Sequence, residues 1–267
     1  MERQYRIMDA HTHIYPERIA EKATEAVGAF YNLPMERLGS VDALLKSGEE
    51  IGVARYVVCS VATTPEQVAS INNFIAQECA IHPAFIGLAA FHPHMVDYEA
   101  ELARVKALGL RGIKFHADFQ RFEMDAPHML PMYQAIAAAD LPVLFHMGDA
   151  RYEYSAPHKL RRVMEQVPEL TAIAAHFGGY QRWAEAREEL QEGNIYFDTS
   201  SSLFALPAEE AVGMIRQMGA DRFLFGTDFP MWDHKTELKR FLALPLTEGE
   251  REQILYGTFE ALYGESG

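Results

Sequence analysis

Cysteine is almost absent from this sequence, since only Cys59 and Cys79 occur among 267 residues. Two cysteines are too few for a disulfide framework, and their separation lacks the spacing of a thiolate metal site. We therefore expect both to be buried thiols, and we look for chemistry elsewhere in the chain.

The sequence also lacks long apolar runs and an excess of positive charge. No stretch approaches the ~20 apolar residues of a membrane span. The 24 Lys and Arg residues are scattered and are outnumbered by 38 Asp and Glu, which gives a net charge of −14. Such a surface repels phosphate groups, so neither a nucleic acid nor a membrane is an expected partner. Because the stretch from Met1 to Tyr5 carries no apolar signal region, we expect a cytoplasmic protein.

No linker, low-complexity tract or shift in composition divides the chain. The length of 267 residues is close to the roughly 250 residues of a single (β/α)8 barrel. Hydrophobic residues make up 49% of the sequence, which is ordinary for a globular protein with a large core. We therefore expect one domain over residues 1–267.

Eight short apolar stretches alternate with helical stretches along the chain. The first strand is expected from Tyr5, and the others at 55–61, 86–91, 112–116, 142–146, 171–176, 195–199 and 222–228. Helices are expected at 16–30, 65–81, 98–108, 129–139 and 248–263, and a further helix is expected to begin after Ser40, which would cap it. This alternation favours parallel strands joined by right-handed crossovers. It predicts an α/β fold of the (β/α)8 TIM-barrel class.

The first expected strand carries Asp9, His11 and His13 at alternate positions. Side chains alternate across a strand, so all three point to one face, and the two imidazoles offer neighbouring nitrogen ligands to a cation. The pair is a weak signal by itself, because a second pair occurs at His92 and His94. Its significance depends on the residues at the other strand ends.

Metal-competent side chains stand at the carboxyl ends of four later strands. In a (β/α)8 barrel these ends converge on the active-site face, so the side chains are expected to lie together. The residues are His116, His146, His176 and Asp228. Together with the first strand they predict a metal site on that face.

Five motifs, taken in order, resemble the amidohydrolase-related family of metal-dependent hydrolases. They are Asp-Ala-His-Thr-His from Asp9, Gly-Ile-Lys-Phe-His from Gly112, Phe-His-Met-Gly from Phe145, Ala-His-Phe-Gly-Gly from Ala175 and Phe-Gly-Thr-Asp-Phe-Pro from Phe225. The resemblance, which extends to amino-carboxymuconate-semialdehyde decarboxylase, implies a metallo-dependent hydrolase type of barrel. It further implies His11, His13, His146 and Asp228 as metal ligands and His176 as a catalytic residue.

These ligands would hold one divalent cation, for which imidazole-rich ligation favours zinc, although manganese, cobalt or iron would fit as well. A cation of this kind lowers the pKa of a bound water to about 7. Asp228 can then accept a proton as general base, while His176 polarises or protonates the substrate oxygen. The expected activity is hydrolysis of a carbonyl-type bond in a small molecule.

Two alternatives to hydrolysis stay open. One is non-oxidative decarboxylation of an unsaturated or aromatic acid, although some decarboxylases of the family replace the first histidine of the pair, and His11 is present here. The other is a barrel that binds a metal or ligand and has lost catalysis.

The substrate-binding candidates are Lys114, His116, Arg151 and Trp232, which lie in or just after the expected strands. Lys114 has two readings: a carbamylated lysine that bridges a second metal, as in some relatives, or a buried ammonium paired with a carboxylate. A single metal is the preferred reading. Dimers are common among relatives, so a homodimer is a further alternative.

Overall fold

The structure is a computed structural model that describes residues 5–264. The expectation drawn from Met1 to Gln4 lies outside the described residues. Two compact units are distinguished: Met1–Val58 with Thr199–Gly267, and Cys59–Asp198. Their boundaries coincide with strand ends, and the single domain expected over residues 1–267 stays a prediction. Among residues 5–264, no helix is long and apolar enough to cross a bilayer.

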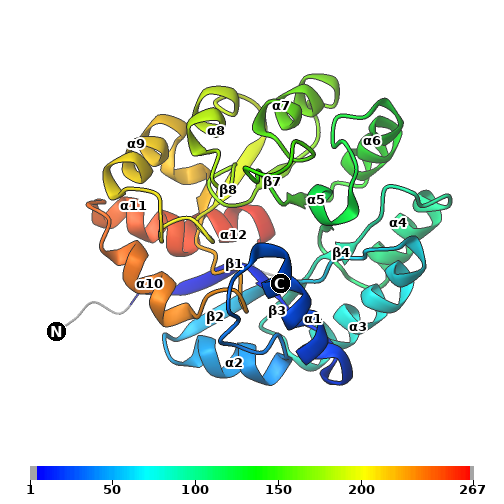
Figure 1. Cartoon of the computed structure of the whole chain (residues 1–267), viewed down its shortest axis with the longest axis horizontal. Helices are drawn as coiled ribbons and strands as arrows, with labels where there is room; N and C mark the ends of the chain where they lie inside the picture. Colours follow the sequence, from blue (N-terminus) through cyan, green and yellow to red (C-terminus); the bar gives the residue numbers. More distant parts are fainter. Residues whose placement is uncertain (1–4, 265–267) are drawn as a thin grey trace. The chain divides into compact units, whose positions relative to one another are not determined.

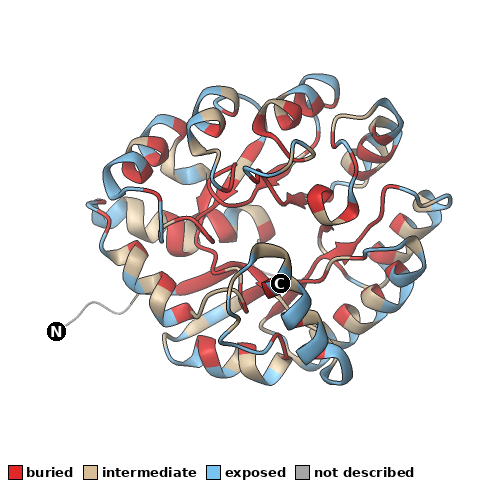
Figure 2. Cartoon of the chain, in the orientation of Figure 1, coloured by how far each residue is buried: buried red, intermediate tan, exposed pale blue. Residues whose placement is uncertain are grey.

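The unit Cys59–Asp198 contains six short strands that are buried or nearly so (Figure 2). They are β3 (Phe85–Gly87), β4 (Ala89–Ala90), β5 (Ile113–Phe115), β6 (Val143–Phe145), β7 (Ala172–Ala174) and β8 (Ile195–Asp198). Strands β4 to β8 are parallel neighbours in chain order. This is the arrangement expected from crossover connections, and the third expected strand is divided at Leu88.

Helices follow the strands of this unit (Figure 1). They are the 3₁₀ turn η1 (Pro65–Gln67) with α3 (Val68–Ile81), α4 (Tyr98–Ala107), α5 (Ala117–Gln120), η2 (Pro127–Met129) with α6 (Leu130–Ala138), α7 (Pro157–Gln166) and α8 (Trp183–Glu189). Asn72 of α3 bonds both backbone groups of Ala90, with its Oδ1 2.7 Å from the amide nitrogen and its Nδ2 3.2 Å from the carbonyl oxygen. The buried amide thereby ties the helix to β4.

The register of the parallel strands determines which of the following residues are neighbours. Phe115 of β5 lies opposite Phe145 of β6, so His116 and His146 follow at matching positions. Phe145 lies in turn opposite Ala174 of β7, which places His176 one residue further along. The alignment brings three expected site residues to one edge of this unit.

The other unit contains β1 (Ile7–His13), β9 (Phe223–Leu224) and β2 (Val53–Cys59), whose last residue belongs to the first-described unit. Strand β1 has β2 as one neighbour. On its other side the Ala10 amide donates to the Phe225 carbonyl at 2.8 Å, and the Asp228 amide donates to the His11 carbonyl at 2.8 Å. The first strand is thus bonded to the chain that follows the last strand.

The helices of this unit confirm several local predictions. They are α1 (Glu17–Tyr31), α2 (Val41–Glu49), α9 (Ala208–Met218), η3 (Ala220–Arg222), α10 (His234–Leu242), α11 (Glu248–Glu252) and α12 (Thr258–Tyr263). Ser40 caps α2 by accepting from the Ala43 amide at 3.3 Å. The single helix expected over 248–263 is instead interrupted by the π turn η4 (Gln253–Gly257), where Gln253 bonds the Thr258 hydroxyl.

Helix α11 begins with a capping box, and the carboxylate in it should make the stability of the folded state sensitive to acid. Thr247 and Glu250 bond one another's amide nitrogens, and Arg216 donates to Glu250 at 2.9 Å. The Arg216 bond and the cap lower the pKa of Glu250 to about 2. A depressed carboxylate pKa stabilises the folded state above the unfolded pKa, near 4.3, and this stability is lost as the pH falls towards 2.

We expect Glu250→Gln to lower the free energy of unfolding by about 1 kcal/mol at pH 7, since solvent screens this partly exposed pair. Urea denaturation at several pH values measures the effect, and the difference from wild type should shrink between pH 5 and pH 2. Glu192→Gln, at an exposed loop glutamate, serves as control and should change little at any pH. Equal stability of Glu250→Gln and wild type at pH 7 would contradict the assignment.

Candidate functional site

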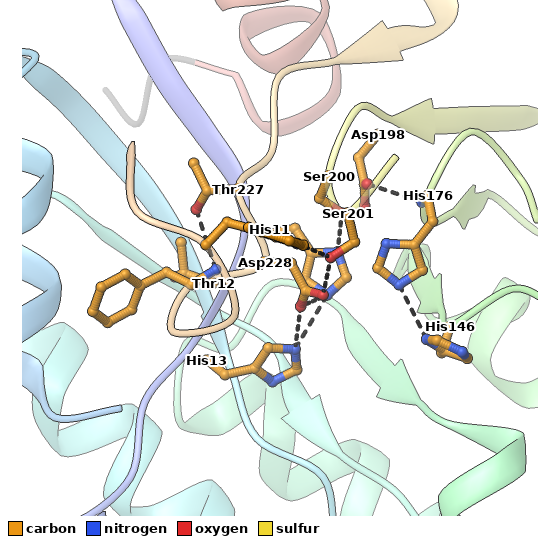
Figure 3. Close-up of polar contacts among 12 residues, drawn as sticks. His11, Thr12, His13, His146, His176, Asp198, Ser200, Ser201, Thr227 and Asp228 are labelled. Carbon is orange, nitrogen blue, oxygen red and sulfur yellow. Dashed lines mark hydrogen bonds and ion pairs between the residues drawn. The ribbon is translucent and has the colours of Figure 1, made fainter. Parts of the chain in front are cut away.

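His11, His13 and Asp228 form a compact donor cluster in the unit that contains β1 (Figure 3). The Nε2 atoms of the two histidines lie 3.2 Å apart. The Oδ1 atom of Asp228 lies 3.2 Å from Nε2 of His13 and 3.6 Å from Nε2 of His11. Strand alternation places the two histidines on one face, and the hydrogen bond from the Asp228 amide to the His11 carbonyl brings Asp228 beside them.

The chemistry and spacing of this cluster fit a divalent cation. Two ligand atoms that lie about 2.1 Å from a common metal are separated by roughly 3.0–3.4 Å for bond angles of 90–109°. The donor separations here are within or close to that range. Two neutral imidazoles and one carboxylate suit zinc, manganese or iron.

Hydrogen bonds from neighbouring hydroxyl and carboxylate groups hold the donor residues in place. Ser200 Oγ lies 3.2 Å from Nδ1 of His11, which leaves Nε2 of that ring as the ligand atom. Asp9 is fully buried and accepts hydrogen bonds from the amide of His11 and from both the amide and the hydroxyl of Thr227. Its Oδ2 also lies 3.1 Å from Nε2 of His234. Asp9 therefore joins β1 to the chain after β9.

The unit Cys59–Asp198 holds a cluster of three histidines at the ends of β5, β6 and β7. The rings of His116 and His146 stack with centroids 3.8 Å apart and planes within 7°. Nδ1 of His146 lies 3.0 Å from Nε2 of His176 (Figure 3). All three side chains are buried, as expected for groups enclosed at strand ends.

The hydrogen bond of His146 to Gly148 determines the protonation of this ring. Nε2 of His146 lies 2.9 Å from the Gly148 carbonyl oxygen, which can only accept. Nε2 therefore carries the hydrogen of the neutral ring, and Nδ1 of that tautomer presents a lone pair towards His176. His146 can serve as a metal ligand through Nδ1, the ring nitrogen that the carbonyl leaves unprotonated.

Asp118 adds a buried carboxylate that the sequence reasoning missed. Its Oδ2 accepts from the Ser155 hydroxyl at 2.6 Å and lies 3.5 Å from Nε2 of His146. Burial raises the pKa of Asp118 to about 7. Asp118 stands two residues after His116, and this position could have indicated it as a site residue. The sequence pattern does not predict the short helix α5 that holds it there.

Left-handed backbone conformations recur at the site residues. In one unit φ is +60° at Asp228 and +46° at Ser201, and in the other it is +61° at His176 and +55° at Phe177. Such conformations cost non-glycine residues on the order of 1 kcal/mol each and concentrate at functional sites. At His176 a bond from its amide to Asp198 Oδ1, at 3.0 Å, holds the turn. The strain supports a functional reading of these positions.

The substrate-binding candidates occupy different environments. Lys114 is buried in β5, and His116 lies at the N-cap of α5. Arg151 is exposed and forms a bidentate pair with Asp149, with Nε–Oδ1 and Nη2–Oδ2 distances of 2.9 and 2.7 Å. Trp232 is half-buried and donates its indole hydrogen to Ser201. Their contact with a substrate stays a prediction.

Within each unit, the predicted ligands and catalytic residues lie together. His11, His13 and Asp228 share one cluster, and His146 and His176 share the other. That all five surround a common cation stays a prediction. The residues overlooked in the sequence were Ser200, Ser201 and Asp118, although the run Thr199-Ser200-Ser201-Ser202 directly after β8 could have drawn attention to the serines.

Solved structures resemble this chain over nearly its whole length. The 5-carboxyvanillate decarboxylase of Sphingomonas paucimobilis is 16% identical, with 97% of this chain and 98% of that chain covered and a TM-score of 0.76. A dihydroxybenzoic acid decarboxylase of Polaromonas sp. JS666, solved with manganese and the inhibitor 2-nitroresorcinol, is 19% identical, with 97% of each chain covered and a TM-score of 0.75. A putative 2-pyrone-4,6-dicarboxylic acid hydrolase of Pseudomonas putida is 17% identical, with 98% of each chain covered and a TM-score of 0.70.

The likeness confirms the predicted (β/α)8 barrel fold. A comparison with curated protein sequences gave no match. The profile of the amidohydrolase family, however, matches residues 8–264, a range that begins just before the histidine pair and includes Asp228. By this match and by the motifs that carry its donor residues, the chain belongs to the amidohydrolase family.

Proposed function

We propose that the protein is a metal-dependent decarboxylase of a hydroxylated aromatic or unsaturated carboxylic acid. The observation that carries the proposal is the donor cluster of His11, His13 and Asp228 in a chain of the amidohydrolase family. The choice of reaction is supported by the Sphingomonas and Polaromonas proteins, both decarboxylases of aromatic acids. We therefore prefer decarboxylation, which the sequence leaves open as an alternative, to the hydrolysis expected from it.

The metal would be held by His11, His13 and Asp228, with His146 as the further ligand that the family motif implies. Bound there, a divalent cation supplies a positive charge that fixes an anionic substrate and stabilises charge developing next to the carboxylate. Zinc is expected from the imidazole-rich ligation, and manganese is tested beside it because the Polaromonas protein was solved with that metal.

Decarboxylation breaks one carbon–carbon bond and releases carbon dioxide, and the electron pair left on the carbon takes up a proton. We propose His176 as the donor of this proton. Nε2 of His176 lies 3.0 Å from Nδ1 of His146, whose lone pair accepts its hydrogen. A metal held by Nδ1 would take up that lone pair, and the hydrogen of His176 would then be available to the substrate. A solvent proton then restores His176. No oxidant or water enters the balance.

The second candidate is the hydrolysis predicted from the sequence, with Asp228 taking a proton from water. The intact pair of His11 and His13 favours it, because some decarboxylases of the family replace the first histidine. The structural similarity of this chain to the putative hydrolase of Pseudomonas putida also supports hydrolysis as the second candidate. A barrel that binds without catalysis is the third alternative.

The experiment offers the zinc-loaded and the manganese-loaded protein two substrate panels. One contains dihydroxybenzoates and carboxylated methoxyphenols, and the other contains esters, amides and lactones. We expect carbon dioxide and the decarboxylated product from the first panel only. Hydrolysis in the second panel without release of carbon dioxide would overturn the proposal, and binding without turnover in either would favour the third alternative.

Elemental analysis of the same preparations decides the reading of Lys114. One equivalent of metal per chain is expected from a single donor cluster. Two equivalents would instead favour a carbamylated Lys114 that bridges two metals.

A further inference from the structure

A directed chain of hydrogen bonds runs from Trp232 through Ser201 to Asp228, all within one unit. The indole Nε1 of Trp232 lies 3.1 Å from Ser201 Oγ, and Ser201 Oγ lies 2.6 Å from Asp228 Oδ2. An indole nitrogen can only donate, so the serine oxygen accepts from Trp232. The serine hydrogen is then directed to Asp228, and the order of donors is fixed.

The surroundings of Trp232 hold its ring in place. Phe204 stacks on it with centroids 5.0 Å apart and planes within 27°, and the guanidinium carbon of Arg240 lies 4.5 Å from the centroid of the ring. Arg240 is itself paired with the buried carboxylate of Glu237. A ring restrained by stacking and by a cation contact keeps its N–H aimed at Ser201.

The chain of hydrogen bonds makes the two oxygens of Asp228 unequal. Oδ2 accepts the short bond from Ser201, whereas Oδ1 lies nearest to the ligand nitrogens of His13 and His11. A carboxylate that is free to rotate would have to be ordered when a cation binds. Here one hydrogen bond fixes the rotation in advance.

We propose that Ser201, oriented by Trp232, is a positioning residue that presents Oδ1 of Asp228 to the metal. The inference rests on the proposed metal centre, and it gives Trp232 a role different from the substrate contact expected from the sequence. Two residues of the loop after β8 would then position metal ligands, since Ser200 contacts His11 and Ser201 contacts Asp228.

Ser201→Gly tests the proposal without strain. Glycine adopts positive φ freely, and φ at this residue is +46°, so the variant keeps or gains stability of the loop while it loses the hydroxyl. We expect the affinity for zinc and manganese to fall about 10- to 100-fold. Competition with a chromophoric chelator on the full chain, without substrate, measures it, and thermal unfolding without metal reports the fold.

Trp232→Phe removes the indole hydrogen and keeps an aromatic ring in the stack. It should weaken metal binding about three- to tenfold, as expected for the loss of one hydrogen bond. In the Ser201→Gly background the same substitution should have no further effect, because the two residues act through one bond to Asp228. A merely structural role of the tryptophan would give additive losses.

Ser202→Ala is the matched control, since its hydroxyl is in the same loop but donates to the Ser200 carbonyl at 3.0 Å. It should retain the metal affinity of the wild type. Wild-type affinity in Ser201→Gly, or additive losses in the double variant, would overturn the inference alone. A wild-type chain that binds metal but releases no carbon dioxide would overturn only the proposed reaction, and one that binds no divalent metal would overturn both.

Discussion

Asp228→Asn should lower kcat/KM by at least about a thousandfold. The substitution keeps the shape of the side chain but removes the negative charge that lies 3.2 Å from Nε2 of His13. An amide nitrogen turned towards the histidines would also oppose a cation, and Ser201 would lose an ionised acceptor. Metal affinity, measured by chelator competition, should fall together with turnover.

Asp233→Asn provides a control of the same chemistry in the same unit. Asp233 caps α10 by accepting from the Thr236 amide at 2.9 Å, a contact that involves none of the donor residues. The control should lose some stability and retain turnover and metal affinity. Wild-type kcat/KM in Asp228→Asn would show that the carboxylate neither holds the metal nor moves a proton.

His176→Asn should lower kcat by about 10²- to 10⁴-fold, the usual contribution of a general acid, while metal affinity stays close to that of the wild type. Asparagine is suited to this test because it tolerates the left-handed backbone, and φ at His176 is +61°. The turn is held by a hydrogen bond from the backbone N–H of residue 176 to Asp198, and this bond does not involve the side chain of His176. The loss should therefore report the imidazole and not a distorted backbone.

Steady-state kinetics with the substrate found in the panel, together with chelator competition, separates the two roles open to His176. His82→Asn, a half-buried histidine at the end of α3 that pairs with Glu78, is the control and should match the wild type. Loss of metal in His176→Asn would make the residue a ligand. Unchanged kcat would remove it from the mechanism.

Local features of the fold followed from the sequence because short-range physics sets them. Each of the eight expected strands was found, although most are shorter than expected, since buried apolar runs between turn residues need no distant information. The Ser40 cap and the end of α4 before Gly109, where φ is +73°, followed in the same way. The π turn at Gln253–Gly257, where Gln253 bonds the Thr258 hydroxyl, did not, because the sequence pattern over 248–263 is that of a regular helix.

The supporting contacts of the site could not be predicted, because they join residues far apart in the chain. Ser201 and Asp228 are separated by 27 positions, and Asp118 and Ser155 by 37. Serine and aspartate are common at strand ends, so nothing in their identity indicated these bonds. The tautomer of His146 is of the same kind, since it depends on the direction of the Gly148 carbonyl.

The sequence by itself determined the candidate donors. Alternation along one strand places His11 and His13 on the same face, and the ends of parallel strands supply His146, His176 and Asp228. Only the tertiary structure decided how each donor is held: which oxygen of Asp228 faces the histidines, and which nitrogen of His146 keeps its hydrogen. Strand periodicity is a local property of the backbone, whereas the orientation of a carboxylate or an imidazole is set by hydrogen-bond partners that folding brings from elsewhere in the chain.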